Sequence, residues 1–327
     1  MGELRAAILG AGLMGRWHVF YLRRNGIPVA AVIDSDLDRA RHLGRRCSRA
    51  PAAPDLRTAM ARQPFEVVHV CTPVASHAAA IEAALAEGKH VLCEKPVACS
   101  PVEGRALLQA AESRGLVLGA VHQFPFQRGF RGLRQRMEQL GEPVRITLRI
   151  CSAGGEGRGP VERQAILVEM LPHAVSVFRA LSMADIAFRV ERRTADDLEL
   201  GGERGATRLE VSLSLRGRPI RNELTVLGTH GTAVLDLFHG YCVFEPGKVS
   251  RSAKILRPFR HGWDLIRSAG TNLIGRAVRG EPAYPGLREL IAAFYRAVRN
   301  HEPFPAGREE MVEAARLIEQ ARRHPAA

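Results

Sequence analysis

The sequence predicts an α/β protein, with a doubly wound parallel sheet at the N-terminus followed by an α+β domain on a mostly antiparallel open sheet. The first observation is a glycine-rich loop between the first apolar run and the first helical stretch. The second is that short apolar runs alternate with helical stretches up to residue 121. The third is that the later runs are joined by tight turns, which is typical of antiparallel strands. We therefore place one domain at residues 1–121 and a second at residues 122–327.

The composition limits the class of protein. The chain has 327 residues, enough for two domains, and its 46% apolar and 25% charged residues are typical of a globular protein. No apolar run approaches the roughly 20 residues that span a bilayer, and no signal-peptide pattern precedes the first strand. The six cysteines form no CxxC pair, so we expect reduced thiols, no metal site and a cytoplasmic location.

The formal net charge of +13 raises the question of an anionic partner. Such a surplus can indicate nucleic acid or an anionic substrate. The arginines that cause it are spread along the chain and are not gathered into one block with aromatic residues. We therefore favour an arginine-rich proteome as the explanation and expect no nucleic-acid partner, while an anionic substrate stays compatible.

The glycine-rich loop predicts a dinucleotide-binding site of the Rossmann type. The apolar run at 4–9 leads into Gly10-Ala11-Gly12-Leu13-Met14-Gly15, and a helix is predicted at 16–25. A lone GxGxxG is weak evidence, but here it stands between a strand and a helix, as the motif requires. Gly10 permits a tight turn, Gly12 lets backbone approach a pyrophosphate, and Gly15 allows close packing of helix on strand. The helix N-terminus offers free N–H groups to the phosphates.

The second predicted strand, 29–33, ends in Asp34. A carboxylate at this distance from the glycines accepts hydrogen bonds from the adenosine ribose hydroxyls and repels a 2′-phosphate. Ser35 and Asp36 follow, and no arginine occurs until Arg39. We therefore expect NAD in preference to NADP as the cofactor. The alternative is that Asp34 is only a turn residue after a strand.

Two further strands end in polar residues at the same sheet edge. The strand predicted at 67–71 ends in Thr72-Pro73, and the helix after it begins at His77. The strand predicted at 91–93 ends in Glu94-Lys95-Pro96. Because ligands bind outside the carboxyl ends of such strands, this edge is the expected site. The remaining elements predicted in this half are helices at 36–46, 56–62 and 101–114 and a strand at 116–121.

Lys95 is the central residue of this predicted site. The proline after it disfavours helical backbone, so we expect Lys95 to be extended at the mouth of a strand. A lysine there has two interpretations: a solvated surface lysine, or a positioned ammonium that donates a proton or hydrogen bond to a substrate oxygen.

In the second half, the pattern predicts one sheet with several helices. A stretch at 261–279 is amphipathic, with Trp263 and Ile266 near one face. We expect this helix to pack on the sheet or on a second subunit, and the alternative is that it binds a membrane surface. Strands are expected at 144–151, 186–193, 206–215, 220–227, 231–237 and 241–244, and helices at 130–140, 161–182, 285–300 and 308–323.

Glu169 and His173 are a second candidate pair. They are four residues apart in the helix predicted at 161–182, so they share one face. A carboxylate one turn from an imidazole can hold its tautomer and leave the other nitrogen free as a base. The alternative is a surface pair without a catalytic role.

Together these motifs resemble the Gfo/Idh/MocA family, the relatives of glucose–fructose oxidoreductase and inositol 2-dehydrogenase. The resemblance rests on the glycine loop, on Thr72-Pro73 with His77, on Glu94-Lys95-Pro96 and on Glu169-x-x-x-His173. It extends through Gly286-Leu287-Arg288-Glu289-Leu290 to Glu302-Pro303-Phe304-Pro305, so it covers essentially the whole chain.

The resemblance implies an NAD(P)-binding Rossmann domain and a substrate-binding domain whose open sheet forms a homodimer or homotetramer. It implies hydride transfer between nicotinamide and a carbinol or ketone of a sugar, cyclitol or sugar nucleotide. Lys95 would hydrogen-bond the reacting oxygen, His173 would exchange the hydroxyl proton, and Glu169 would assist His173. Residues implied at the cofactor are Gly10, Gly12, Leu13, Met14, Gly15, Asp34, Ser35, Thr72, Pro73, His77, Glu94 and Lys95. His122 and Gln123 lie where the family often contacts substrate.

The substrate half departs from the family pattern. Glu169 stands where the family usually has aspartate, and the glycines that usually precede it are Gln164, Ala165 and Ile166. Ser176 replaces the usual acid three positions after the histidine, and Pro125 replaces an arginine before Phe126. The cofactor half keeps the pattern, so these changes concern the substrate and the reaction.

Two other functions compete with a dehydrogenase. One is a glycosidase or lyase that oxidises its substrate transiently with tightly held NAD and produces no net NADH. The other is a cofactor-sensing regulatory protein that has lost catalysis, which the changes at 164–166 and the basic charge would fit.

Overall fold

The computed structural model describes residues 3–183, 186–247, 250–306 and 308–325, apart from the side chains of residues 252 and 253. The chain divides into two compact units. Unit 1 comprises Met1–His122 and Leu287–Glu319, and unit 2 comprises Gln123–Gly286 and Gln320–Ala327.

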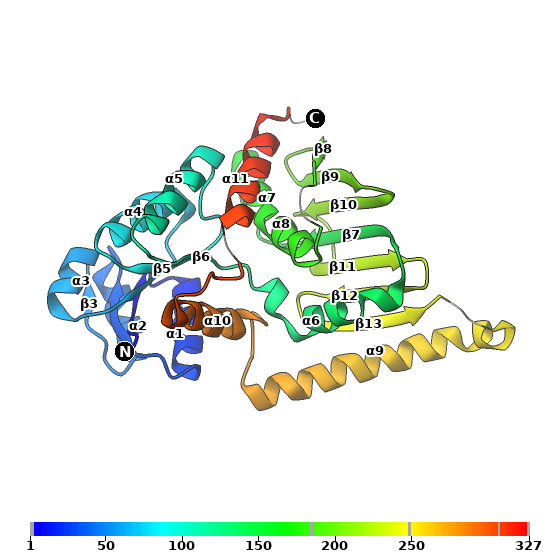
Figure 1. Cartoon of the computed structure of the whole chain (residues 1–327), viewed down its shortest axis with the longest axis horizontal. Coiled ribbons are helices and arrows are strands. Elements are labelled where there is room, and N and C mark those ends of the chain that lie inside the picture. The colour runs from blue at the N-terminus through cyan, green and yellow to red at the C-terminus, as the bar shows by residue number, and fades with distance from the viewer. Residues whose placement is uncertain (1–2, 184–185, 248–249, 307, 326–327) are drawn as a thin grey trace. The chain divides into compact units, whose positions relative to one another are not determined.

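Unit 1 is built on a six-stranded sheet in the order β3-β2-β1-β4-β5-β6, and every strand pair is parallel (Figure 1). All residues of β4, and those of β1 up to Ile8, are buried whichever face they point to, which is why these strands read as mostly apolar runs. The strand order reverses between β1 and β4, where ligands bind in such sheets. The predicted doubly wound sheet is confirmed. Its strands are β1 (Ala6–Leu9), β2 (Val29–Ile33), β3 (Ala52–Ala53), β4 (Val67–Val70), β5 (His90–Cys93) and β6 (Leu118–Ala120).

The helices of unit 1 include part of the chain's end. Residues 287–319 belong to unit 1, whereas the sequence placed everything after residue 121 in one second domain. The reason is packing, since Asn25 donates a hydrogen bond to the carbonyl of Arg288 at 3.0 Å and Phe294 lies close to Gly119. The helices are α1 (Leu13–Arg24), α2 (Leu37–Arg45), α3 (Leu56–Arg62), η1 (Val74–Ser76), α4 (His77–Ala86), α5 (Pro101–Glu112), α10 (Leu287–Asn300) and α11 (Arg308–Arg323), whose last turn belongs to unit 2.

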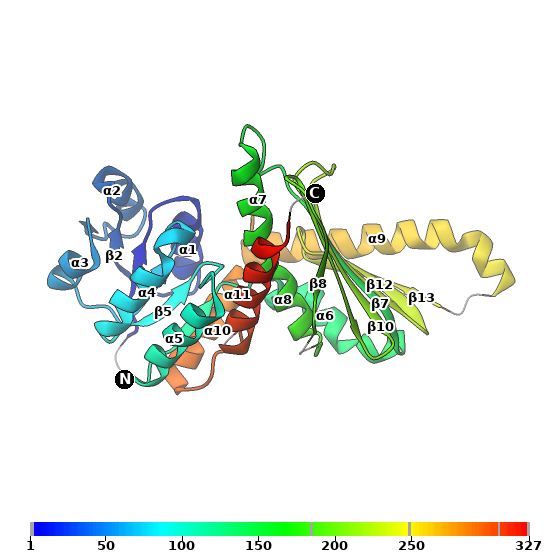
Figure 2. The same cartoon turned by 90° about the horizontal axis from the view of Figure 1, so that it is seen from above.

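Unit 2 is built on a seven-stranded sheet in the order β13-β12-β11-β7-β10-β9-β8 (Figure 1). Every pair is antiparallel except β7 with β10, so the predicted mostly antiparallel sheet is confirmed. Alternate residues of β10 are buried, and Figure 2 shows α7 and α8 on one face of the sheet. The strands are β7 (Pro143–Cys151), β8 (Arg189–Arg193), β9 (Asp197–Arg204), β10 (Thr207–Ser214), β11 (Arg221–Gly228), β12 (Gly231–Asp236) and β13 (Tyr241–Pro246).

Strand β9 was missed in the sequence. Its apolar alternation is interrupted by Gly201 and Gly202, which read as a turn. A side chain at position 202 would collide with Ile186 and approach Phe188, so the close packing of these residues requires a glycine.

Two helices predicted as continuous are broken. The stretch at 161–182 forms α7 (Pro160–Glu169) and α8 (Leu171–Ala180), because Pro172 has no N–H to continue the ladder and stands in the first turn of a new helix. The stretch at 130–140 likewise forms α6 (Arg128–Gln135) and η3 (Met137–Leu140), and η2 (Phe124–Phe126) precedes α6.

The open face of the unit 2 sheet is polar. It carries the ion pairs Arg145–Glu210 and Arg149–Glu223, which join neighbouring strands. Association through this sheet stays a prediction. At its edge, α9 (Arg251–Arg279) runs alongside β13 and is longer than the predicted 261–279 (Figure 1). Within the described parts of the chain, no helix is long and apolar enough to cross a membrane.

Candidate functional site

The glycine loop between β1 and α1 has the geometry of a phosphate cradle. Gly10 has a φ of +104°, and a Cβ there would lie 2.6 Å from the carbonyl carbon of Cys71. A Cβ on Gly15 would lie 2.0 Å from the carbonyl oxygen of Gly10, so the helix touches the loop directly. Gly12 differs, because a Cβ there would meet nothing within 4 Å. It caps α1 without a side-chain hydrogen bond, so open space adjoins a helix N-terminus that no side chain caps.

Asp34, at the end of β2, is tied to this loop. Its Oδ2 accepts a hydrogen bond from the N–H of Ala11 at 2.8 Å, and its Oδ1 accepts one from the N–H of Asp36 at 2.9 Å. Asp36 in turn caps α2 and pairs with Arg39 at 2.8 Å. The arginine nearest in sequence is thus engaged by a carboxylate. The residues present fit a dinucleotide at this edge of the sheet.

His77 joins the two loops that follow β4 and β5. The ring is 1% exposed; its Nδ1 lies 2.8 Å from the carbonyl oxygen of Pro96 and its Nε2 lies 2.8 Å from that of Thr72. A neutral imidazole can donate to only one of these carbonyls, and an imidazolium can donate to both. His77 was predicted to contact the cofactor, and in the structure it fixes the loops that carry Thr72 and Lys95.

Glu94 ends a buried chain of polar side chains that the sequence reasoning missed. His18 Nε2 lies 3.1 Å from Glu94 Oε1, His18 Nδ1 lies 2.7 Å from His69 Nδ1, and His69 Nε2 lies 3.0 Å from the Tyr295 hydroxyl. With Glu94 ionised and both histidines neutral, each ring nitrogen has one role: Tyr295 donates to His69, His69 donates to His18, and His18 donates to Glu94.

Burial favours the neutral forms of His69 and Tyr295 in this line of hydrogen bonds. It holds the pKa of His69 well below its usual value, with His18 beside it as a smaller cause. It also raises the pKa of the Tyr295 hydroxyl, which therefore keeps its proton. A signal for the chain existed in the sequence, since His69 interrupts an apolar strand and a buried polar side chain requires a partner.

Lys95 follows β5 and is half-buried. Both of its neighbours are anchored within unit 1: Glu94 through its side chain to His18 of α1, and Pro96 through its carbonyl to His77 of α4. The Lys95–Pro96 peptide bond is cis. The backbone of Lys95 is therefore held between the helix that begins at the glycine loop and the helix that follows Thr72.

Glu169 and His173 do not share one continuous helix, which corrects the expectation from their spacing. Glu169 is the last residue of α7, and His173 lies in the first turn of α8, after Pro172. Both side chains are half-buried. The His173 ring lies against the Phe124 ring, with centroids 4.5 Å apart, and Ser176 donates a hydrogen bond to the His173 carbonyl at 3.0 Å.

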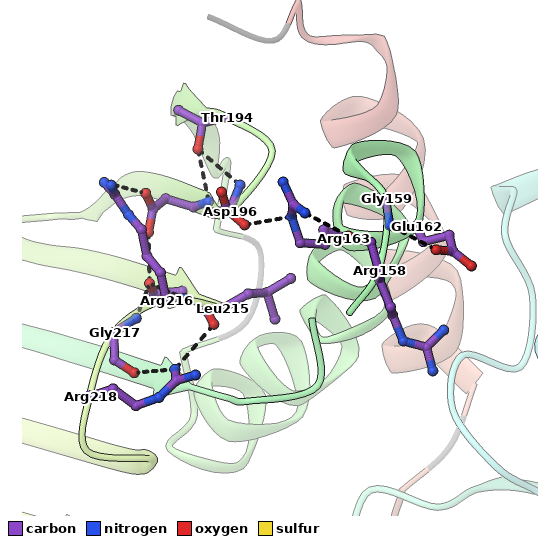
Figure 3. A network of polar contacts seen from close by, with 12 residues as sticks. Arg158, Gly159, Glu162, Arg163, Thr194, Asp196, Leu215, Arg216, Gly217 and Arg218 are labelled. Carbon is purple, nitrogen blue, oxygen red and sulfur yellow. Dashed lines mark hydrogen bonds and ion pairs between the residues drawn. The ribbon is translucent and has the colours of Figure 1, made fainter. Parts of the chain in front are cut away.

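The start of α7 is anchored by a polar network, shown in Figure 3. Arg163 of α7 points toward Asp196 in the β8–β9 turn, with an Nε–Oδ1 distance of 2.7 Å. Arg216 and Arg218, in the turn after β10, pair with Asp197 and Glu156 at 2.8 and 2.6 Å. The Arg158 guanidinium points away from these pairs in Figure 3. The sheet turns thus fix the helix that carries Gln164, Ala165, Ile166 and Glu169.

The other predicted residues have distinct surroundings. His122 is 1% exposed, and its Nδ1 hydrogen-bonds the carboxylate of Glu310 within unit 1. Gln123, the first residue of unit 2, is half-buried. Leu13 is exposed beside the glycine loop, as is Ser35 after β2. The remaining predicted cofactor residues are Met14, which is half-buried, and Pro73, which is exposed.

Among the residues that the structure describes, no group of three or more His, Cys, Asp or Glu is placed to hold a metal ion.

Comparison with known proteins finds a family match for the first part of the chain. Residues 4–122 match the profile of the GFO_IDH_MocA family, described as "Oxidoreductase family, NAD-binding Rossmann fold". A D-glucoside 3-dehydrogenase of Escherichia coli is 34% identical over 161 residues, which cover 47% of this chain and 46% of that protein. The scyllo-inositol 2-dehydrogenase (NADP(+)) of Bacillus subtilis is 30% identical over 123 residues, 38% of each chain. The matched stretch thus spans less than half of these curated relatives.

Solved structures extend the likeness of fold to the whole chain. A levoglucosan dehydrogenase in complex with NADH and levoglucosan superposes with a TM-score of 0.78 over 98% of this chain and 96% of that one. At 16% identity this likeness concerns the fold alone.

Proposed function

We propose that this protein is a dehydrogenase or ketoreductase that uses NAD, because residues 4–122 match the model of the Gfo/Idh/MocA oxidoreductase family, with its NAD-binding Rossmann fold. Its substrate would be a sugar, a cyclitol or a sugar nucleotide, reacting at a carbinol or ketone. The observation that supports this most is the double anchoring of Lys95, whose neighbours are bonded to α1 and α4. A surface lysine without a function would need no such support.

The cofactor would lie along the sheet edge that the glycine loop forms. The uncapped first turn of α1 and the open space at Gly12 would receive the pyrophosphate, and Asp34 would accept hydrogen bonds from the adenosine ribose. When bound, NAD supplies the ring that accepts or returns the hydride. The Asp34 carboxylate would repel a 2′-phosphate, which is our reason for proposing NAD over NADP.

The protein's own groups would handle the proton. Lys95 would donate a hydrogen bond to the substrate oxygen and favour the developing alkoxide by its charge. His173 would take the hydroxyl proton, since an alkoxide expels hydride far more readily than an alcohol does. Glu169 would hold the tautomer of His173, and the Phe124 ring would fix the plane of the imidazole.

An anionic substrate is part of this proposal. Arg158, Arg216 and Arg218 are exposed around the start of α7, and the latter two are already paired with carboxylates. Of these three arginines, Arg158 is the one whose guanidinium points away from the ion pairs in Figure 3. It would suit a phosphate of a sugar phosphate or nucleotide.

The test is a substrate screen at 340 nm. The purified protein is mixed with NAD or NADP and with pools of cyclitols, free sugars, sugar phosphates and sugar nucleotides. NADH formation with one pool supports the proposal and identifies the substrate class. Tight NADH binding with no net NADH from any pool would favour transient oxidation or a regulatory role. Absence of NADH binding would contradict the interpretation of the glycine loop.

A further inference from the structure

The long helix α9 carries an apolar stripe that unit 2 does not cover. At roughly 1.5 Å per residue its 29 residues extend for about 43 Å. Phe259, Trp263 and Ile266 are 77%, 66% and 65% exposed, although they are large and apolar. The stripe also includes Ile255, Leu256, Leu273 and Ile274, each more than half exposed. Monomeric proteins rarely expose an apolar surface of this extent without a partner.

The opposite side of α9 faces unit 2. Arg257 and His261 contact Glu245 of β13 at 2.8 and 3.0 Å, and Asn272 donates to the carbonyl of His239 at 2.9 Å. These residues lie about half a helical turn away from Phe259 and Trp263. The bonds to unit 2 are therefore polar and on one side, and the apolar side chains point outward.

A seam along this face of α9 has the spacing of a helix–helix contact. Leu256, Phe259, Trp263, Ile266, Gly270, Leu273 and Ala277 follow one another at alternating steps of three and four residues. This alternation keeps one narrow seam facing a partner helix over three heptads.

Gly270 is the smallest residue on this face of α9. A Cβ at this position would meet nothing within 4 Å, so the chain's own packing does not require a glycine here. In an exposed helix interior, glycine costs about 1 kcal/mol relative to alanine. A second backbone that passes close to the helix would explain why a small residue stands at this point of the seam.

The exposed area approaches that of a specific dimer interface. Each aliphatic side chain offers roughly 100 Å² and each aromatic one about 150–250 Å², so the partly exposed stripe presents about 550–700 Å². Two copies would together bury about 1,100–1,400 Å², above the roughly 1,000 Å² expected of a biological interface.

We propose that α9 pairs with α9 of a second copy of this chain, antiparallel about a two-fold axis near the middle of the helix. Leu256, Phe259 and Trp263 make the N-terminal half of the seam bulky, whereas Gly270 and Ala277 make the C-terminal half small. A two-fold axis brings the bulky half of one copy onto the small half of the other. This contact is distinct from the open sheet and is compatible with a second interface there.

Charge distinguishes this occupant from an anionic membrane. Arg260 and Arg267 are exposed at the rim of the stripe. Two copies bring these like charges together, so salt that screens them leaves the pairing unchanged or strengthens it. Binding to anionic lipid would instead weaken as salt increases.

The test is the mass of the full-length protein by analytical ultracentrifugation, for wild type and two matched variants. Ile266→Glu places a charge in the seam, and Val278→Glu places one at an 83% exposed position outside it. We expect Ile266→Glu to halve the mass of the assembly and raise its Kd by about 100-fold or more, because an unpaired charge is buried. Val278→Glu should leave both unchanged, and circular dichroism should show equal helix content in all three.

Gly270→Leu separates the two occupants further. It adds apolar surface, so it should weaken pairing about tenfold or more through overpacking, whereas it would strengthen binding to lipid. A wild-type protein that is monomeric overturns the proposal. An assembly that Ile266→Glu leaves intact also overturns it. So does a wild-type protein that binds phosphatidylserine vesicles in place of a second copy, with tighter binding by Gly270→Leu.

Discussion

At the residue scale, the support of Lys95 depends on groups that do not touch the proposed substrate. Tyr295, His69, His18 and Glu94 form one buried line of hydrogen bonds that ends beside it. Each internal member has a partner on both sides, so removing one leaves a buried polar atom without compensation.

Tyr295→Phe tests this line at its far end. The change removes the hydroxyl that donates to His69 Nε2 and leaves that buried nitrogen without its donor. We expect the free energy of unfolding to fall by about 1–3 kcal/mol, measured by urea denaturation at neutral pH. A loss below about 0.5 kcal/mol would mean that this hydrogen bond does not stabilise the fold.

The lowered pKa of His69 makes stability depend on pH. Unfolded histidine takes up a proton as the pH falls through about 6.5, and buried His69 does not, so the unfolded state binds more protons. Stability from this source is complete above pH 6.5 and is lost below it, by about 1 kcal/mol for the first pH unit. His69→Gln should reduce the slope of unfolding free energy against pH in this range.

His42 provides the control, because it is exposed on α2. His42→Gln should leave the slope as in the wild type. An unchanged slope in His69→Gln would show that His69 is protonated in the folded protein.

At the element scale, the glycine loop separates packing from binding. Gly15→Ala would place a Cβ 2.0 Å from a backbone oxygen, so we expect a loss of more than about 3 kcal/mol in unfolding free energy. Gly12→Ala meets open space and should cost at most about 1 kcal/mol, a capping effect. It should nevertheless weaken NADH binding about tenfold or more, measured by fluorescence titration. Equal NADH affinity in Gly12→Ala and the wild type would show that the phosphates do not bind at this loop.

The same elements show what sequence could predict. β1, β4 and the loop after β1 were predictable because buried parallel strands and close-packed glycines constrain composition directly. The break between α7 and α8 was missed, although Pro172 indicated it, because the apolar spacing continues across it. β9 was missed since Gly201 and Gly202 are required by contacts outside their own strand, with residues such as Glu191 and Ile186.

At the scale of the whole molecule, chain order misled the division into units. The end of the chain returns to unit 1, where Phe294 and Phe304 pack on Gly119. Nothing local to 287–319 specifies that return, because an amphipathic helix can cover any apolar face. The candidate site was predictable at Gly12, Asp34 and Lys95, whose motifs are local. The line from Tyr295 to Glu94 was not, since it joins four elements of unit 1.

The most direct test of the central claim is the rate of NADH formation in wild type and in Lys95→Met, with the substrate identified by the screen. NADH affinity, measured for both proteins by fluorescence titration, shows whether the cofactor site is intact. We predict equal NADH affinity and a loss of at least about 100-fold in kcat for Lys95→Met, because the hydrogen bond to the reacting oxygen is gone. A kcat within a few-fold of the wild type would contradict the account and leave Lys95 without a part in the reaction.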